Sequence, residues 1–408
     1  MLLIAIILVG GGFIAGWASS PANTTSDASS NEPAAAAKKF GIFWQAWNIL
    51  DQHYVDQKAL NPTTMTYGAI SGMLDSLGDT GHTRFLSPAD LAQEQQSLSG
   101  QLEGIGAELA IRNGQPTIVA PLPDSPALKA GVRAGDVLVK VNGNDVANDT
   151  LDQIVSQVSG KAGTKVTISV IHPGQSKVTD ITITRAKILV PSVTYAMLPG
   201  TKVADVLISQ FAEKTTYQLV QTIKDARAQG ATAILLDLRN NPGGIFDEAI
   251  GVASQFISKG AVLIEQNAQG QRKVDDVTPG GSATSIPMVV LVNSGTASAS
   301  EIVAGAIQDH NRAKIVGQTT FGTGTVLSQY NLSDGSAILV GTTEWFTPDG
   351  HQIWHKGITP DISVSLPANV MPLTPLTEQN MTAKQLQSSG DAQLLKALSL
   401  LEQQQASK

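Results

Sequence analysis

The sequence contains no cysteine, which excludes thiol catalysis, disulfides and thiolate metal sites but does not indicate a redox compartment. It also has no block rich in lysine or arginine, and its formal net charge is -7. Without a basic patch there is no electrostatic footprint for nucleic acid or for an acidic lipid surface. Nucleic acid is therefore not an expected partner. No internal repeat of fixed period is visible, so solenoids and propellers are set aside.

The 408 residues, 42% of them apolar, are enough for two or three domains with packed cores. The segment Met1 to Ala18 is apolar or glycine, and the first basic residue is Lys38. We interpret it as an export segment, a signal anchor in preference to a cleaved signal peptide, with both alternatives open. It is short for a membrane span and lacks preceding basic residues, so a start further upstream also stays open. The expected location is the cell envelope, outside the cytoplasm, either anchored to the membrane or secreted.

Local patterns divide the rest of the chain. Residues 19–37 are expected to be a flexible linker, and 38–96 a helical region with two amphipathic helices packed into a core, since apolar residues recur at helical spacing from Phe43 to Tyr54 and from Tyr67 to Leu77. Short alternating segments predict a β-rich module at 97–187. Buried-strand runs that feed glycine-rich turns and then helices predict an α/β core at 188–370. A connector and a helix around Ala392 to Leu401 follow at 371–408.

The β-rich module carries two sequence blocks, EGIGAEL from Glu103 to Leu109 and DSPALKAGVRAGDVLVKVNG from Asp124 to Gly143. Together with the helical pattern after them they resemble a PDZ domain. Such a domain would bind a peptide carboxylate in the nest of amides of its glycine-containing loop, with the peptide added as a strand. A simple turn is the alternative for the glycines alone, and the second block outweighs it. The expected peptide site comprises Gly104, Ile105, Gly106, Ala107 and Leu109, with Leu151 and Val155 beside an apolar pocket.

Two glycine-rich turns carry the chemistry of the core. The first block, from Leu235 to Gly244, reads LLDLRNNPGG and ends a strand. The second block, from Val290 to Gly324, reads VLVNSGTASASEIVAGAIQDHNRAKIVGQTTFGTG and runs from a strand through a turn into a helix. With SLGDTGHTRFLSP and FTPDGHQIWHKGITPDI in the same order, the chain from Trp44 onward resembles the carboxyl-terminal processing, or tail-specific, peptidases. The resemblance implies a multidomain α/β and α+β protein with a core similar to the crotonase and Clp-protease spiral. It also implies an exported Ser/Lys endopeptidase that needs no metal or nucleotide cofactor and cuts polypeptides with apolar C-termini.

The resemblance places the nucleophile at Ser298, and the oxyanion hole at the backbone N–H groups of Ala299 and Gly244. A helix N-terminus favours the negative charge that develops there, and glycine allows the backbone to approach the reacting carbonyl closely. Ser298 and Glu301 also fit a helix capping box, which needs no catalysis. The surrounding family motif outweighs that alternative, and the two roles are compatible.

The sequence departs from the family at the general base. The lysine expected twenty-five residues after the serine is replaced by Thr323, and the glutamine that orients it is replaced by Leu327. A threonine hydroxyl has almost no basicity, so it cannot take the serine proton. Other candidate bases are weak: His310 lies about 18 Å along the nucleophile's helix, and His351 and His355 could approach only through the fold. Lys314 and Lys356 are expected at the surface, and Asp237 and Arg239 in a salt bridge.

Two functions remain close, and the first is slightly preferred because it is the family assignment. One is a peptidase that uses Ser298 with a relocated base or none, acting on exported polypeptides with free apolar C-termini. The other is a pseudopeptidase that binds such polypeptides as a scaffold or regulator. Acyl-CoA chemistry on a similar core is disfavoured because a PDZ module and an export segment serve polypeptides. The N-terminal segment would connect either protein to the membrane, and the oligomeric state is left open, a homo-oligomer included.

Overall fold

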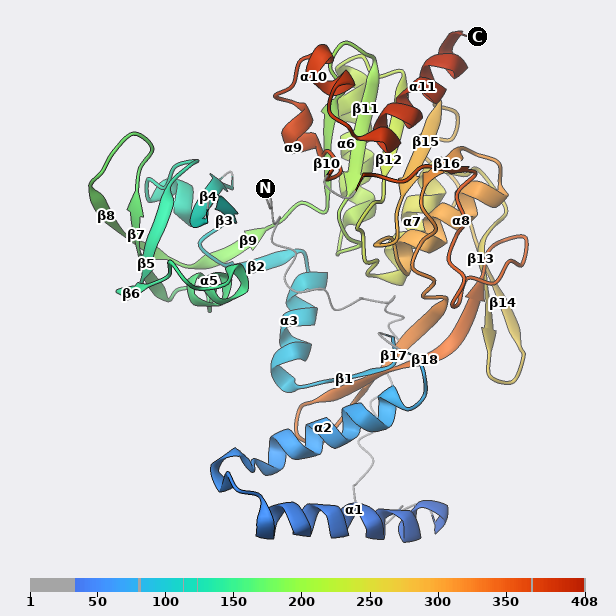
Figure 1. Ribbon diagram of the computed structural model, residues 1–408. Helices are drawn as coiled ribbons and strands as arrows, with labels where there is room; N and C mark the ends of the chain where they lie inside the picture. Colours follow the sequence, from blue (N-terminus) through green and yellow to red (C-terminus); the bar gives the residue numbers. More distant parts are fainter. Residues whose placement is uncertain (1–33, 80–81, 113, 123, 368–369, 407–408) are drawn as a thin grey trace.

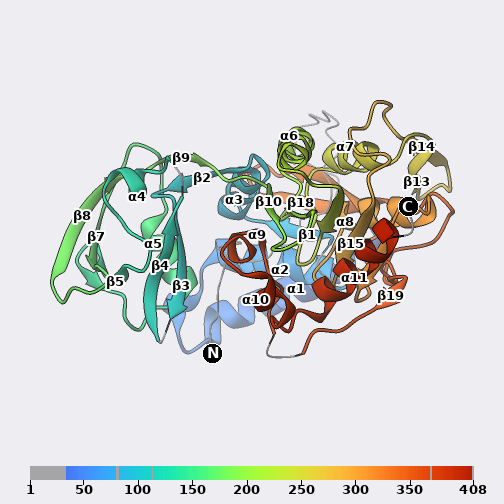
Figure 2. The same cartoon turned by 90° about the horizontal axis from the view of Figure 1, so that it is seen from above.

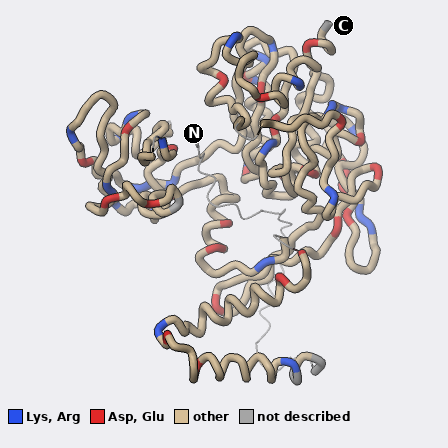
Figure 3. Tube along the Cα trace, in the orientation of Figure 1, with Lys and Arg blue, Asp and Glu red and all other residues tan. Residues whose placement is uncertain are grey.

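The structure is a computed structural model that describes residues 34–79, 82–112, 114–122, 124–367 and 370–406. The export segment expected at Met1 to Ala18 lies outside these residues. Within the described part of the chain, no helix is both long and apolar enough to cross a membrane. Figure 3 shows lysine and arginine scattered among acidic residues over the described elements, in line with the absence of a basic block from the sequence.

Helix α1 (Ala34–His53) stands away from the core, beyond helix α2 (Figure 1). Its first residues belong to the segment expected to be linker, so the helix begins earlier than the pattern predicted. The prediction that this helix packs into a core is wrong, because Trp44 and Leu50 are 55% and 43% exposed. Its aromatic side chains contact each other instead, as Phe43 and Trp47 do with ring centroids 5.9 Å apart. An apolar stripe shows that a helix is amphipathic but not what covers it.

Helix α2 (Pro62–Asp75) begins where the Asn61 side chain accepts a hydrogen bond from the Thr64 amide at 3.1 Å. A short 3-10 turn (Gln57–Ala59) precedes it, and strand β1 (Arg84–Leu86) and helix α3 (Pro88–Leu98) follow. Strand β1 pairs antiparallel with strand β18 (Ala337–Phe346), Arg84 opposite Leu339. This pairing fixes the segment just before β1 against the sheet that contains β18.

The β-rich module is a sheet in the order β3-β4-β5-β7-β8, with β6 beside β5 and helices α4 and α5 packed on it. Strand β3 lies at the open edge of the sheet. Figure 2 shows the module beside the core, joined to it by strands β2 and β9. The bounds are β2 Gln101–Gly104, β3 Ala107–Arg112, β4 Gln115–Pro121, α4 Pro126–Lys129, β5 Val137–Val141, β6 Asn144–Asp145, α5 Leu151–Val158, β7 Lys165–Ile171, β8 Val178–Thr184 and β9 Ala186–Leu189.

The core is a six-stranded sheet in the order β10-β11-β12-β15-β16-β19, parallel except for β10. All five residues of β12 and of β15 are buried, as expected for a parallel sheet covered on both faces. The bounds are β10 Val193–Met197, β11 Val203–Ile208, α6 Thr215–Ala228, β12 Ala233–Asp237, α7 Phe246–Phe256, β15 Met288–Val292, α8 Ala299–Asp309, β16 Lys314–Gly317 and β19 Ile362–Ser363.

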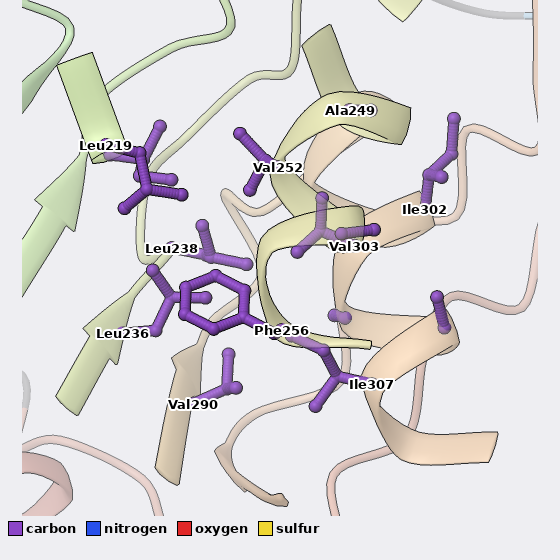
Figure 4. Packing of buried hydrophobic residues seen from close by; sticks show 14 of the residues in the cluster. Leu219, Leu236, Leu238, Ala249, Val252, Phe256, Val290, Ile302, Val303 and Ile307 are labelled. Carbon is purple, nitrogen blue, oxygen red and sulfur yellow. The ribbon is translucent and has the colours of Figure 1, made fainter. Parts of the chain in front are cut away.

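Helices α6, α7 and α8 cover one face of this sheet and helix α11 (Ala392–Ala406) covers the other (Figure 2). Alternate residues of each strand point to opposite faces, so Leu236 and Val290 pack against Phe256 of α7 (Figure 4). Their neighbours Leu235 and Leu291 join the cluster under α11. Short helices α9 (Pro375–Glu378) and α10 (Ala383–Gln387) precede α11.

A second sheet joins the core to the N-terminal region. It has the order β1-β18-β13-β14, with β17 also paired to β18. The long β17–β18 hairpin reaches from the core toward α2 (Figure 1). The remaining bounds are β13 Ala261–Asn267, β14 Arg272–Asp276 and β17 Thr325–Asn331.

Candidate active site

The two glycine-rich turns meet at the carboxyl edge of the core sheet. Strands β12 and β15 are parallel neighbours, so the loops that leave them lie side by side, at the edge where open α/β sheets bind ligands. The carbonyl oxygen of Asn241 in the first turn accepts hydrogen bonds from the Ala297 amide and the Ser300 hydroxyl in the second, both at 3.0 Å. These contacts hold the two turns together as one unit.

Ser298 occupies the N-cap of α8 with φ 55° and ψ -119°, and it is 2% exposed. A residue with a side chain rarely adopts this conformation, which costs energy and is typical of functional turns. Strand-to-helix turns that present a nucleophilic serine have such a strained residue. The structure therefore places the expected nucleophile on a strand-turn-helix elbow.

The side chain of Glu301 holds this turn. Its carboxylate is fully buried and accepts hydrogen bonds from the amides of Ser298 at 2.9 Å, Thr323 at 2.9 Å and Gly322 at 2.7 Å, and from the Thr320 hydroxyl. Burial raises the pKa of Glu301, against the opposite effect of these donors. The Glu301 amide itself donates to the Ser298 backbone carbonyl at 2.8 Å. The expected capping box of Ser298 and Glu301 is thus present, and the carboxylate has a wider structural role than capping.

Gly244 has the geometry expected of an oxyanion-hole residue. Its φ is 140°, and a Cβ there would lie 2.2 Å from the carbonyl oxygen of Phe211. The two residues form a parallel bridge made by the Ile245 amide and the Gly243 carbonyl, which leaves the Gly244 N–H directed away from Phe211. Ala299, the first residue of α8, has the second expected N–H. Their joint action on a carbonyl stays a prediction.

Thr323 is completely buried, and among the described residues its hydroxyl has no hydrogen-bond partner. Its amide is bound to Glu301, so the backbone of the loop is well held although the side chain is not basic. Leu327 is 1% exposed and packs with Leu86 and Leu339 in a small apolar cluster. The position of the family glutamine therefore contributes apolar packing here.

The other basic groups weighed from the sequence are exposed or already bonded to other residues. His310 donates to the Ala261 carbonyl at 2.8 Å, and His351 is 72% exposed beside Asp309. His355 is exposed, although its backbone amide bonds Gly322. Lys314 is paired with Asp361 and Lys356 is exposed, as expected for surface charges.

Arg239 is 3% exposed and forms the predicted salt bridge with Asp237 at 2.7 Å. A second, unpredicted one joins it to Asp391 at 2.9 Å, just before α11. The C-terminal helix is thereby tied to the strand that leads into the Gly244 turn.

His82 was missed by the sequence reasoning. It is 2% exposed, its Nδ1 lies 3.1 Å from an oxygen of Asp79, and its ring meets that of Phe321 with centroids 5.7 Å apart. Among the described residues its Nε2 has no hydrogen-bond partner although it is buried. The only signal was a histidine three residues after an aspartate in the family block SLGDTGHTRFLSP, and no regular element connected it to the serine.

The peptide site of the β-rich module is only partly as expected. Strand β3 has a free edge next to α5, and Gly106 has φ 74° in a loop where a Cβ would lie 2.5 Å from Cβ of Ser125. Ile105 and Leu109 are 3% and 1% exposed, so their side chains belong to the module's core and do not line an open pocket. This corrects the expectation for these two residues. The adjacent Ala107, Leu151 and Val155 are partly buried beside them, and Gly104 ends β2.

Comparison with known proteins places the chain. Residues 202–364 match the model of peptidase family S41 and residues 117–171 match a PDZ domain. The chain is 38% identical over 348 residues to a CtpA-like serine protease of Staphylococcus epidermidis, with 84% of this chain and 69% of the relative covered. A homologue of the same description from Staphylococcus aureus is 37% identical over 336 residues, with 80% of this chain and 66% of the relative covered.

Two solved structures are similar to the chain. An S41 protease from Bacteroides fragilis is 15% identical with a TM-score of 0.52, covering 87% of this chain and 96% of that one. The photosystem II D1 C-terminal processing protease is 30% identical with a TM-score of 0.48, covering 85% and 97%. The family model and the curated relatives thus define a serine hydrolase of the peptidase class. The chain belongs to the carboxyl-terminal processing serine peptidases of family S41, with an internal PDZ domain.

Proposed function

We propose that this protein is an endopeptidase that hydrolyses exported polypeptides near apolar C-termini, with Ser298 as its nucleophile. The observation that carries the proposal is the backbone of Ser298, strained at the start of α8 and held there by buried Glu301. In this arrangement the hydroxyl would attack a peptide carbonyl. The N–H groups of Gly244 and Ala299 would stabilise the resulting oxyanion in a site that excludes water.

The PDZ module would select the substrate. An apolar C-terminal peptide would add as a strand to the free edge of β3, and the amides of the Gly104 to Ala107 loop would bind its terminal carboxylate. Ala107, Leu151 and Val155, which are partly exposed beside this edge, would contact the terminal side chain. Leu109 would support them from the core of the module.

Hydrolysis is tested with an unfolded polypeptide that ends in an apolar residue. Wild-type protein should cleave it and should be labelled at Ser298 by a fluorophosphonate. Ser298→Ala should do neither while it unfolds at a similar temperature. Adding one charged residue at the substrate's C-terminus should slow cleavage if the PDZ module recognises that end. Cleavage that persists in Ser298→Ala would assign the activity to another group or to a contaminant.

A binding function is the second candidate, and the replacement of the family lysine by buried Thr323 favours it. A pseudopeptidase would capture the same C-termini without cutting them. Wild-type protein that binds the polypeptide in a pull-down, with neither labelling nor cleavage over many hours, would support this function. Even without a base, an intact oxyanion hole and binding site can leave about 10³ to 10⁴-fold acceleration over water, so slow cleavage is enough to reject it.

We also propose a location, domain bounds, a core topology and an assembly state for this protein. The Met1 to Ala18 segment would direct the protein out of the cytoplasm and connect it to the membrane, which fractionation of cells with and without this segment would test. The domains proposed from the sequence are 38–96, 97–187, 188–370 and 371–408, and the core is proposed to share the crotonase and Clp-protease spiral. Homo-oligomerisation is compatible with the exposed apolar side chains of α1 and is testable by sedimentation.

A further inference from the structure

A serine hydroxyl needs a nearby group that can take its proton, and Thr323 cannot do this. A base for Ser298 must therefore come from another residue around the two turns. Such a group needs a basic nitrogen or oxygen that is not already engaged and a position next to the Ser298 turn. Of the described groups in contact with this region, the imidazole of His82 has both.

His82 lies next to the Ser298 turn through its contact with Phe321. Phe321 donates its backbone N–H to the Thr296 carbonyl at 2.9 Å, two residues before Ser298, and its ring meets the ring of His82. Gly322 and Thr323, which follow Phe321, share the Glu301 carboxylate with the Ser298 amide. His82 thus contacts a loop that is connected to the Ser298 turn in two ways. One is the hydrogen bond of Phe321 to Thr296, and the other is the shared Glu301 carboxylate.

Strand β18 supports this position independently, because it pairs with strand β17, which follows the Thr323 loop. The amide of Gly341 in β18 donates to the Thr83 hydroxyl at 3.0 Å. A Cβ on Gly341 would lie 3.4 Å from Oδ2 of Asp79 and 3.3 Å from the hydroxyl of Thr325, which opens the strand after the Thr323 loop. Asp79 and His82 are therefore seated on the β17–β18 hairpin where it leaves the candidate active site.

The contact with Asp79 determines the tautomer of the neutral His82 imidazole. An ionised carboxylate only accepts hydrogen bonds, so in the neutral imidazole the nitrogen facing Asp79 carries the proton and Nε2 holds the lone pair. Asp79 also accepts from the Thr83 hydroxyl at 2.7 Å and from the Thr83 amide at 3.2 Å, which fixes its orientation. Burial alone would raise its pKa, but the bonds from His82 and Thr83 outweigh this and lower it to about 2. Asp79 is thus an oriented anion behind the ring.

A buried aspartate-histidine pair can also be purely structural, and this chain contains one. His172 and Asp136 in the PDZ module are both buried, with Nδ1 2.7 Å from the carboxylate. The difference lies at the other ring nitrogen. Among the described residues, Nε2 of His82 is buried without a partner, and so are the nearby hydroxyls of Thr323 and Thr325. Buried polar atoms are normally paired, so unpaired ones gathered around one loop indicate a functional site.

We propose that His82 is the general base of this peptidase, with Asp79 as the residue that positions it, so that Ser298, His82 and Asp79 replace the Ser/Lys pair of the family. This inference rests on the proposed hydrolase function. As the Ser298 oxygen bonds to the substrate carbonyl carbon, its proton passes to Nε2. When the C–N bond breaks, that proton goes to the leaving amine. A water molecule then attacks the acyl ester, gives a proton to Nε2, and this proton returns to the serine oxygen as the ester bond breaks.

The test measures the rate of fluorophosphonate labelling of Ser298 and the kcat/KM for the apolar-tailed polypeptide, on the full chain. His82→Ala should lower both by about 10² to 10⁴-fold. Added imidazole should restore part of the rate, because it can enter the space left by the ring. Asp79→Asn should also lower the rate, since an amide does not favour the required tautomer. His172→Ala, the matched control from the structural pair, should stay within a few-fold of wild type and should not respond to imidazole.

The outcomes separate the two proposals. If wild type is labelled and cleaves while His82→Ala reacts equally fast, the inference about His82 is overturned and the hydrolase function stands. If wild type neither reacts nor cleaves, the proposed function fails and the inference fails with it. Should His82→Ala unfold, His82→Gln keeps the volume and one polar atom of the ring. A folded Gln variant with wild-type labelling overturns the proposal just as well.

Discussion

The backbone N–H of Thr323 donates a hydrogen bond to Oε2 of Glu301 at 2.9 Å. The same oxygen accepts the N–H of Ser298 at the same distance, so one buried carboxylate connects the nucleophile's turn to the loop where the family has its lysine. The loop is therefore held in place although its catalytic side chain has changed.

Glu301→Gln should loosen both sides of the site. Four donors converge on the carboxylate, and an amide would place its own N–H₂ group against some of them. Leaving such buried donors unsatisfied costs roughly 1 to 3 kcal/mol each, so the free energy of unfolding should fall by several kcal/mol. The labelling rate of Ser298 should fall at least about tenfold, consistent with a misplaced nucleophile. Thermal unfolding and labelling kinetics measure the two effects.

The control for this variant is Glu402→Gln, an exposed glutamate on α11. It should change neither quantity. A Glu301→Gln protein that is labelled at the wild-type rate would show that the carboxylate is dispensable for the geometry of the turn.

Gly244→Ala should remove one oxyanion donor without touching the nucleophile. The added Cβ would lie 2.2 Å from the Phe211 carbonyl, so the turn has to move. Loss of one such donor typically lowers kcat by about 10² to 10³-fold. Gly230→Ala is a matched control, because its φ of 94° is also positive but nothing lies within 4 Å of the new Cβ. It should cost about 1 kcal/mol of stability and leave kcat unchanged. Equal kcat values for the two variants would argue against an oxyanion role for Gly244.

Much of the core could be predicted from the sequence because its signals are local. The runs that became β12 and β15 are apolar except for Asp237 and lead into glycine-rich turns, so a buried parallel sheet was the natural prediction. The motif around Ser298 placed the serine at the start of a helix, where the structure has it. The salt bridge of Asp237 with Arg239 was predictable because two residues separated by one position on a turn can reach each other.

What could not be predicted depends on contacts between distant parts of the chain. His82 reaches the active-site loop because β1 pairs with β18, Arg84 opposite Leu339, and no local pattern encodes that pairing. Asp391 meets Arg239 only after α11 has docked on the sheet. The exposure of α1 likewise depends on what lies next to it. Single-sequence reasoning therefore located the serine and both turns but did not consider His82.

Thr323→Lys tests whether the loop can still accept the family's base. An ammonium group enclosed beside the buried Thr323 site would have a lowered pKa and could take the serine proton. In a His82→Ala background, the lysine should raise the labelling rate of Ser298 at least about tenfold at pH 8, since general-base catalysis is worth this much or more. Thr323→Met is the matched control, with similar length and no amine. Identical rates for the Lys and Met variants would show that the loop no longer aims a side chain at the serine.

The stability of the segment that leads to α11 should depend on pH because of the buried carboxyl groups of Asp205 and Glu378. Both residues are fully buried, and among the described residues no donor reaches any of their four oxygens. Burial raises the pKa of Glu378 to about 7, and burial together with the charge of Glu378 raises the pKa of Asp205. The two groups face each other, so a shared proton is the way to satisfy them.

In the unfolded chain both carboxyls titrate at about pH 4. Between about pH 5 and pH 7 the folded protein therefore holds a proton that the unfolded chain has lost. This stabilisation is complete below the unfolded pKa and is lost as the pH rises through about 7, the folded pKa of Glu378. Glu378→Gln replaces the proton by a permanent amide donor. Its Tm should therefore fall less than that of wild type between pH 5.5 and pH 8.5, by about 5 °C or more, and should exceed the wild-type Tm at the higher pH. Parallel curves of Tm against pH for the two proteins would mean that the pair holds no extra proton in the folded state.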